Sequence, residues 1–157
     1  MAVTVGADLS NAVSDFTDGK SFDLGDLYCY GDKEYVYVQA DGAIVSGDVC
    51  IISEAHQADQ IDTTNSAGAI GDRVGVAVHA FADNEYGFLQ IAGPVDAINV
   101  GSSAAANTKL NTTATAGRID DDATSGAETI LGLVTTAAES SNSAAGILHR
   151  PWIDATL

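Results

Sequence analysis

The chain has 157 residues, 46% of them hydrophobic, and its 22 acidic residues against 6 basic ones give a formal net charge of -16 at pH 7. This length fits one domain, or one domain with an arm. The few, scattered bases argue against nucleic acid and anionic membranes as partners, because phosphate binding needs clustered Lys and Arg. No apolar run approaches the roughly 20 residues of a membrane span, and no signal peptide is visible, so we expect folding in a cytoplasm.

The first part of the chain, residues 1–22, is polar with isolated apolar positions. We predict an extended arm here, followed by a single β domain over residues 23–157. Spaced apolar residues on such an arm fit contacts with a neighbouring subunit, and a frayed terminus is the alternative. The apolar contact candidates on the arm are Val3, Val5, Phe16 and Phe22.

Residues 34–39, Glu-Tyr-Val-Tyr-Val-Gln, alternate like a strand. The alternation places Tyr35 and Tyr37 on one face and the two valines on the other. Two tyrosines on one face suit a stacking platform for sugars or bases. Packing at a sheet face or a subunit contact is the interpretation we favour, given the acidic charge.

Both cysteines, Cys29 and Cys50, lie in apolar runs that read as strands. We expect two buried thiols that act as small hydrophobic side chains. A disulfide between them is the alternative, and a cysteine metal site is disfavoured because no Cys-x-x-Cys spacing occurs.

Residues 54–70 lack a clear period and read as one long connection, a kind of segment that often makes contacts. It contains His56, Asp59 and Asp62, which are potential metal ligands. A lone histidine among acids in a loop is usually solvated, so we predict no metal there.

Residues 72–101 are the strongest hairpin signal: strands at 74–80 and 86–91 flank the polar turn 82–85. Gly93-Pro94 should break the ladder, because proline lacks the amide donor, and a third strand should follow this corner. A similar pattern recurs at residues 130–149, which predicts two related hairpins packed face to face. The pattern is that of an all-β barrel or sandwich with little helix.

Catalytic signatures are scarce. No nucleophile elbow, phosphate loop or histidine pair is present, and His79 reads as a strand residue rather than a base. The three adjacent acids Asp120 to Asp122 predict a solvated turn, since calcium loops alternate their ligands. We therefore expect no enzyme and no cofactor. The alternative is a hydrolase that uses Asp83 and Glu85, which are separated by a single residue.

The only tryptophan, Trp152, follows a proline near the end of the chain. It is expected either to close one end of a barrel or to anchor on a neighbouring subunit. Ile153, beside it, is the second contact candidate in this segment.

Three groups of sequence segments resemble the capsid decoration, or cement, proteins of tailed bacteriophages, and the resemblance covers roughly residues 24–150. They are Ala-Asp-Gly-Ala-Ile-Val-Ser-Gly-Asp-Val at 40–49, Gly-Val-Ala at 75–77 with Ala-Asp-Asn-Glu-Tyr-Gly-Phe-Leu-Gln-Ile-Ala-Gly at 82–93, and Ala-Asn-Thr-Lys-Leu at 106–110 with Ala-Gly-Arg-Ile-Asp-Asp at 116–121.

The resemblance implies a small β-barrel or tulip-like β fold. It also implies homotrimers seated on the major capsid protein at local three-fold positions on the outer surface of the virion, with the arm reaching the shell or a neighbour. Three copies of this acidic chain would repel one another, so the seat should be basic, bridged by cations, or apolar enough to compensate. A carbohydrate- or receptor-binding module using Tyr35, Tyr37 and residues 54–70 is the alternative.

Overall fold

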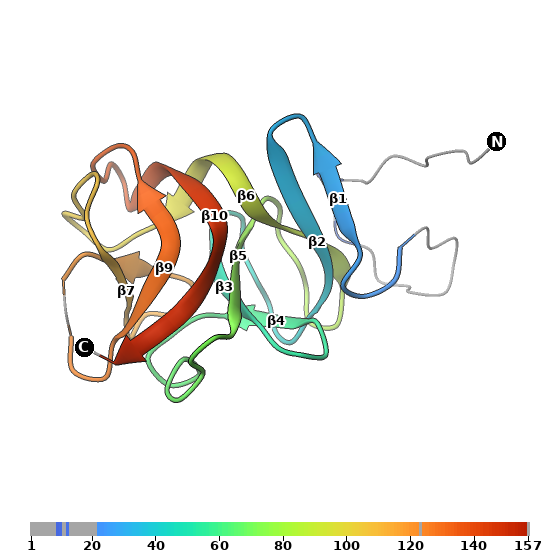
Figure 1. Cartoon of the computed structure of the whole chain (residues 1–157), viewed down its shortest axis with the longest axis horizontal. Helices are drawn as coiled ribbons and strands as arrows, with labels where there is room; N and C mark the ends of the chain where they lie inside the picture. The colour runs from blue at the N-terminus through green and yellow to red at the C-terminus, as the bar shows by residue number, and fades with distance from the viewer. Residues whose placement is uncertain (1–8, 11, 13–21, 123, 157) are drawn as a thin grey trace.

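The computed structural model of the chain describes residues 9, 10, 12, 22–122 and 124–156 (Figure 1). The strands of this part are β1 (Leu27–Tyr30), β2 (Lys33–Ala40), β3 (Val49–Ile52), β4 (Gln57–Gln60), β5 (Arg73–Ala77), β6 (Tyr86–Asn99), β7 (Leu110–Thr112), β8 (Ile119–Asp120), β9 (Glu128–Thr135) and β10 (Ser143–Thr156). The described residues contain no helix long and apolar enough to cross a membrane. The predicted all-β fold class is confirmed.

The strands β2, β4, β3, β5 and β6 close into a ring. β2 pairs with β4 in parallel, and the other pairs, β4–β3, β3–β5, β5–β6 and β6–β2, are antiparallel. The short strand β4 lies inside the segment that the sequence predicted as one long connection. Its polar composition, Gln-Ala-Asp-Gln, hid it, because only Ala58 is fully buried.

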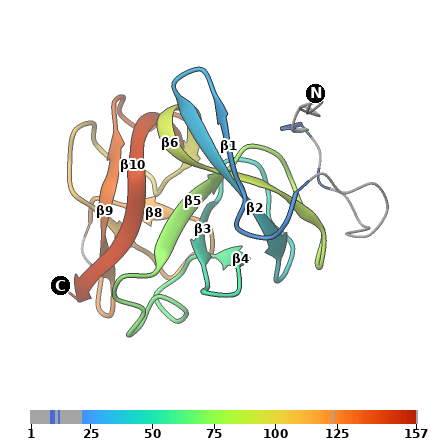
Figure 2. The same ribbon diagram turned by 45° about the vertical axis from the view of Figure 1, so that its right-hand side comes forward.

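The other half of the sheet continues from β6 through β10, β9 and β7 to β8. A parallel bridge joins Ile119 of β8, the last strand of this half, to Val100, which follows β6 directly. This half of the sheet therefore also closes on β6. The chain therefore forms two joined strand rings that share β6. In Figures 1 and 2, β9 and β10 lie at one end of the molecule and β1 and β2 at the other.

β3 separates two hydrophobic cores. Val49 and Ile51 contribute to the core of the second ring, whereas Cys50 and Ile52 contribute to the core of the first. Successive side chains of a strand point to opposite faces, so a strand between two cores must be apolar at every position. All four residues of β3 are accordingly buried.

The two cysteines differ in exposure, and both are free thiols. Cys50 is buried as predicted, and burial raises the pKa of its thiol well above the ordinary value, with Asp48 and Asp59 adding to the effect. Cys29 is exposed, so the prediction that both thiols are buried is wrong for this residue. Its strand, β1, pairs only with β2 in the described sheet and lies at its edge.

The predicted pairing of the central hairpin is confirmed, with Val76 opposite Gln90 in antiparallel β5 and β6. The prediction of a separate third strand after Gly93-Pro94 is wrong, since β6 runs through this corner to Asn99. β6 changes neighbours here. Ala92 is the last residue paired with β2, and Pro94 is paired with β10. Ala92 is also the first residue paired with β10, opposite His149, so Pro94 lies two residues inside the β6–β10 ladder.

The second predicted hairpin is also present, as β9 and β10, with Leu133 opposite Leu148. The two hairpins do not pack face to face, as the sequence suggested. They lie edge to edge in one sheet, because β6 and β10 are hydrogen-bonded neighbours. The pattern of the two hairpins was readable from sequence, but the way they join was not.

Gly93 has a left-handed backbone with φ +88°, and a Cβ atom there would overlap the carbonyl of Asp32. We expect Gly93→Ala to lower the free energy of unfolding by more than about 2 kcal/mol, since the left-handed conformation alone costs a residue with a Cβ about 1–2 kcal/mol. Gly31→Ala is the control, because Gly31 has φ +63° but open space around it. Urea unfolding measures both, and equal losses would contradict the close approach.

Candidate docking face and cleft

An exposed row of three side chains crosses β5, β10 and β9. Trp152 of β10 is the register partner of Arg73 on β5 and of Leu131 on β9. Residues directly opposite on neighbouring strands point to the same side of a sheet. Trp152 is 41% exposed and Leu131 is 37% exposed, and Arg73 is exposed as well. A cation, an indole and an aliphatic side chain therefore lie side by side on the outer face.

Two further residues extend this row. Arg150 is exposed and donates to the carboxylate of Glu34 from two guanidinium nitrogens, at 2.8 Å and 2.7 Å. Leu27 of β1 borders a shallow depression of about 110 Å³ together with Arg73 and Arg150. We call the set the Arg–Trp face. Its members are Leu27, Arg73, Leu131, Arg150 and Trp152.

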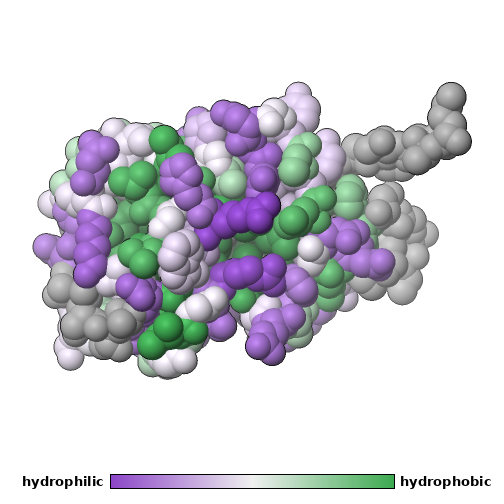
Figure 3. Space-filling view, viewed as in Figure 1, coloured by the Kyte–Doolittle hydropathy of each residue, from purple (hydrophilic) through white to green (hydrophobic). Residues whose placement is uncertain are grey.

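The Arg–Trp face differs from the rest of this acidic chain. It carries two of the 6 basic residues and three of the large hydrophobic side chains that are exposed in the described residues. Figure 3, which views β9, β10 and β5 from the front, shows strongly hydrophilic and hydrophobic side chains next to one another near the middle of the molecule. Trp and Arg are the residues that most often dominate binding energy at protein interfaces.

The structure separates the two contact candidates near the C-terminus. Trp152 is 41% exposed on the outer face of the sheet, so it does not close a barrel end, and the prediction of a surface anchor is left. Ile153 has no exposed surface and belongs to the core of the second ring. Neighbouring residues on a strand face opposite ways, so the expectation of a surface contact at Ile153 gives way to a packing role.

The predicted tyrosine face exists but is covered. Tyr35 and Tyr37 are each 5% exposed and pack with Phe88. The ring of Phe22 lies 5.8 Å from that of Tyr37 and 4.9 Å from that of Phe88, centroid to centroid. The tyrosines therefore pack at a sheet face rather than form an open stacking platform, and Phe22 packs against the β domain. The arm candidates Val3, Val5 and Phe16 lie outside the described residues.

The paired acids of the central turn stabilise the turn itself. Asp83 accepts a hydrogen bond from the amide of Gly42 at 3.1 Å, and Glu85 accepts one from the amide of Ala82 at 2.7 Å. Both carboxylates thus hold the backbone around the turn. His79 follows the end of β5 instead of lying within a strand, and its ring packs against Phe81 with centroids 4.4 Å apart.

The other acids singled out in the sequence have similar local roles. Asp62 accepts hydrogen bonds from the amides of Thr64 and Asn65, at 2.7 Å and 2.9 Å. In the acidic turn, burial and a side-chain hydrogen bond to Asp121 raise the pKa of Asp120. No group of three or more possible metal ligands comes together in the described residues.

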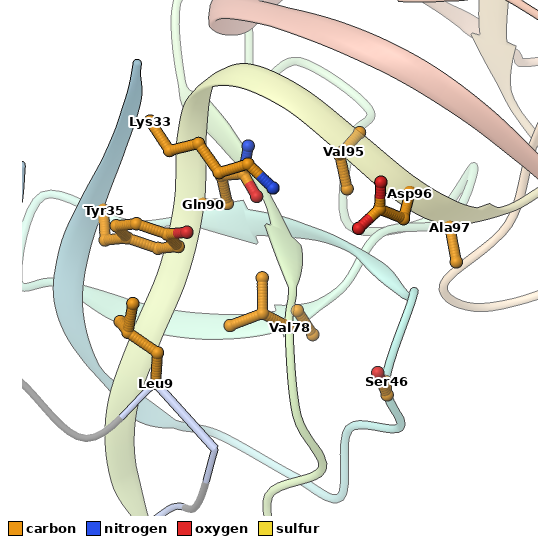
Figure 4. Close-up of a pocket in the computed structure, with 10 residues that line it drawn as sticks. Leu9, Lys33, Tyr35, Ser46, Val78, Gln90, Val95, Asp96 and Ala97 are labelled. Atoms are coloured by element: carbon orange, nitrogen blue, oxygen red, sulfur yellow. The ribbon is translucent and has the colours of Figure 1, made fainter. Parts of the chain in front are cut away.

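A cleft of about 290 Å³ lies over the paired strands β2 and β6, beside the end of β5 (Figure 4). Its lining comes from four separate parts of the chain and from the arm: Leu9, Lys33, Tyr35, Ser46, Ala77, Val78, Gln90, Val95, Asp96 and Ala97. No motif in the sequence marks this cleft, because only the β2–β6 pairing and the loops beside it bring these residues together.

Neither a scan against protein-family models nor a search of curated proteins found a match to the chain.

Proposed function

We propose that the protein is a structural component of a tailed bacteriophage that decorates and stabilises the outside of the icosahedral head, as homotrimers at local three-fold positions. The Arg–Trp face is the observation that carries the proposal. A decoration protein acts through many modest contacts repeated by symmetry. An exposed face that combines Trp152, two arginines and two leucines suits such a contact.

Charge supports the same use of this face. A chain with a net charge of -16 is repelled by further copies of itself and by other acidic surfaces. Arg73 reduces that repulsion where it lies, and Arg150 neutralises Glu34 beside it. The apolar side chains of the face add attraction that salt does not screen. The partners we propose are the major capsid protein and a second and third copy of this chain.

Two measurements test the proposal. Light scattering of the purified protein should give three times the chain mass, with and without divalent cations. Co-sedimentation with expanded phage heads that lack their own decoration protein should give saturable binding at a ratio set by the local three-fold positions. A monomer at every concentration, together with no binding to heads at low salt, would contradict the proposal.

A further inference from the structure

Five polar groups face the cleft over β2 and β6 and have no protein partner in the described part of the chain. None of these five groups takes part in a hydrogen bond or an ion pair with another described residue. They are the Lys33 ammonium, the Tyr35 hydroxyl, the Ser46 hydroxyl, the Oε1 atom of Gln90 and the Asp96 carboxylate. Convergence of a few free polar groups on a partly apolar cleft is typical of ligand sites.

Gln90 gives the strongest indication. Only 1% of the residue is exposed. Its Nε2 atom donates to the carbonyl oxygens of Ala92 at 3.1 Å and Pro94 at 2.8 Å, which uses both amide hydrogens. The side chain is therefore fixed in orientation, and Oε1 is left without a donor. Oε1 is not among the side-chain atoms that are buried without a partner, so solvent or a ligand in the cleft can reach it. Figure 4 shows this amide at the wall of the cleft.

The charged groups of the cleft balance one another. Lys33 stands on β2 and Asp96 on β6, and they form no ion pair with each other in the described structure. Burial raises the pKa of the Tyr35 hydroxyl, with Asp32 and Asp96 adding to the effect. Tyr35 therefore stays protonated and remains a hydrogen-bond donor at neutral pH.

The remaining lining of the cleft is apolar and small, with Leu9, Val78 and Val95 as its larger members. A volume of about 290 Å³ lies at the lower end of the usual range for ligand pockets. The cleft thus offers donors, acceptors and an aliphatic surface to a ligand of about one ring.

We propose that this cleft binds one uncharged, hydroxyl-rich ring of monosaccharide size, the terminal sugar of a glycan. Sugar hydroxyls both donate and accept, so they match Lys33 and Tyr35 as donors and Gln90 and Asp96 as acceptors. The C–H surface of the ring packs on the aliphatic lining. A simple anion would meet Asp96 and a simple cation would meet Lys33, which favours a neutral ligand.

This inference stands apart from shell decoration, because the residues of the cleft are not those of the Arg–Trp face. With so few contacts, a single sugar should bind with a Kd of about a millimolar. Several copies held on one particle would bind a glycan-coated surface more tightly than a single copy.

The test is an NMR chemical-shift titration of the full chain with methyl glycosides of glucose, galactose, mannose and N-acetylglucosamine, up to about 50 mM, well above the expected Kd. At least one sugar should give saturable shifts in the Gln90 side-chain amide and in the backbone of residues 95–97. Glycine, acetate and ammonium chloride should give none. Absence of saturable shifts with every sugar, or stronger binding of a charged probe, would overturn the proposal.

Variants separate the cleft from its surroundings. Tyr35→Phe, which removes only the hydroxyl, should weaken sugar binding by about fivefold, and so should Asp96→Asn. Tyr37→Phe is the matched control, because Tyr37 has the same burial on the same strand face and does not line the cleft. Equal binding by Tyr35→Phe and Tyr37→Phe, with unchanged binding by Asp96→Asn, would place the sugar elsewhere.

Discussion

Trp152→Ala is expected to weaken binding to phage heads by at least about 30-fold for each chain, the effect of losing about 2 kcal/mol at a dominant interface residue. The indole is 41% exposed and stands between Arg73 and Leu131 in the Arg–Trp face, so its loss removes the largest apolar contact there. Because a trimer binds through several copies at once, the loss for the whole assembly should be larger. Co-sedimentation with expanded heads measures it.

Val45→Ala is the control for this variant. Val45 is 55% exposed and lies in the loop before β3, outside the Arg–Trp face. The Val45→Ala variant should bind phage heads as tightly as the unaltered protein does. Circular dichroism should show that both variants keep the β fold. Head binding by Trp152→Ala at the unaltered level would show that this face is not where the protein docks.

Sequence reasoning found Trp152 but not its partners, and the reason is physical. Exposure of a tryptophan near a chain end can be suspected from local sequence, whereas its contact with Arg73 depends on the pairing of β5 with β10. That pairing joins distant parts of the chain, and no local pattern encodes it. The cleft was missed for the same reason, since Lys33 and Asp96 meet only through the β2–β6 arrangement.

Local patterns were more informative where a single face was concerned. The alternation in β2 correctly placed Tyr35 and Tyr37 on one side and Val36 and Val38 in the core. The apolar run of β3 was correctly read as a strand. Nothing in the run shows that it separates two cores, because burial on both faces gives the same continuous apolar pattern for any central strand.

Asp48 shows how the two rings are held together at the start of that strand. It is only 2% exposed, and its carboxylate accepts three hydrogen bonds from different parts of the fold. The donors are the amide of Val45, the side chain of Gln60 on β4, and the side chain of Asn99 at the end of β6. Gln60 belongs to the first ring, and Asn99 lies where β6 leads into the second.

Asp48→Ala is therefore expected to lower the free energy of unfolding by about 3–5 kcal/mol, because it leaves three donors without an acceptor in a buried site. Asp48→Asn keeps the shape and one carbonyl oxygen, so it should lose less. Asp83→Ala is the matched control: Asp83 is exposed and accepts one hydrogen bond, from Gly42, which is worth about 1 kcal/mol or less. Urea unfolding compares the three variants. If Asp48→Ala lost no more than Asp83→Ala, the contact between the rings would have to rest on their shared strands and apolar cores alone.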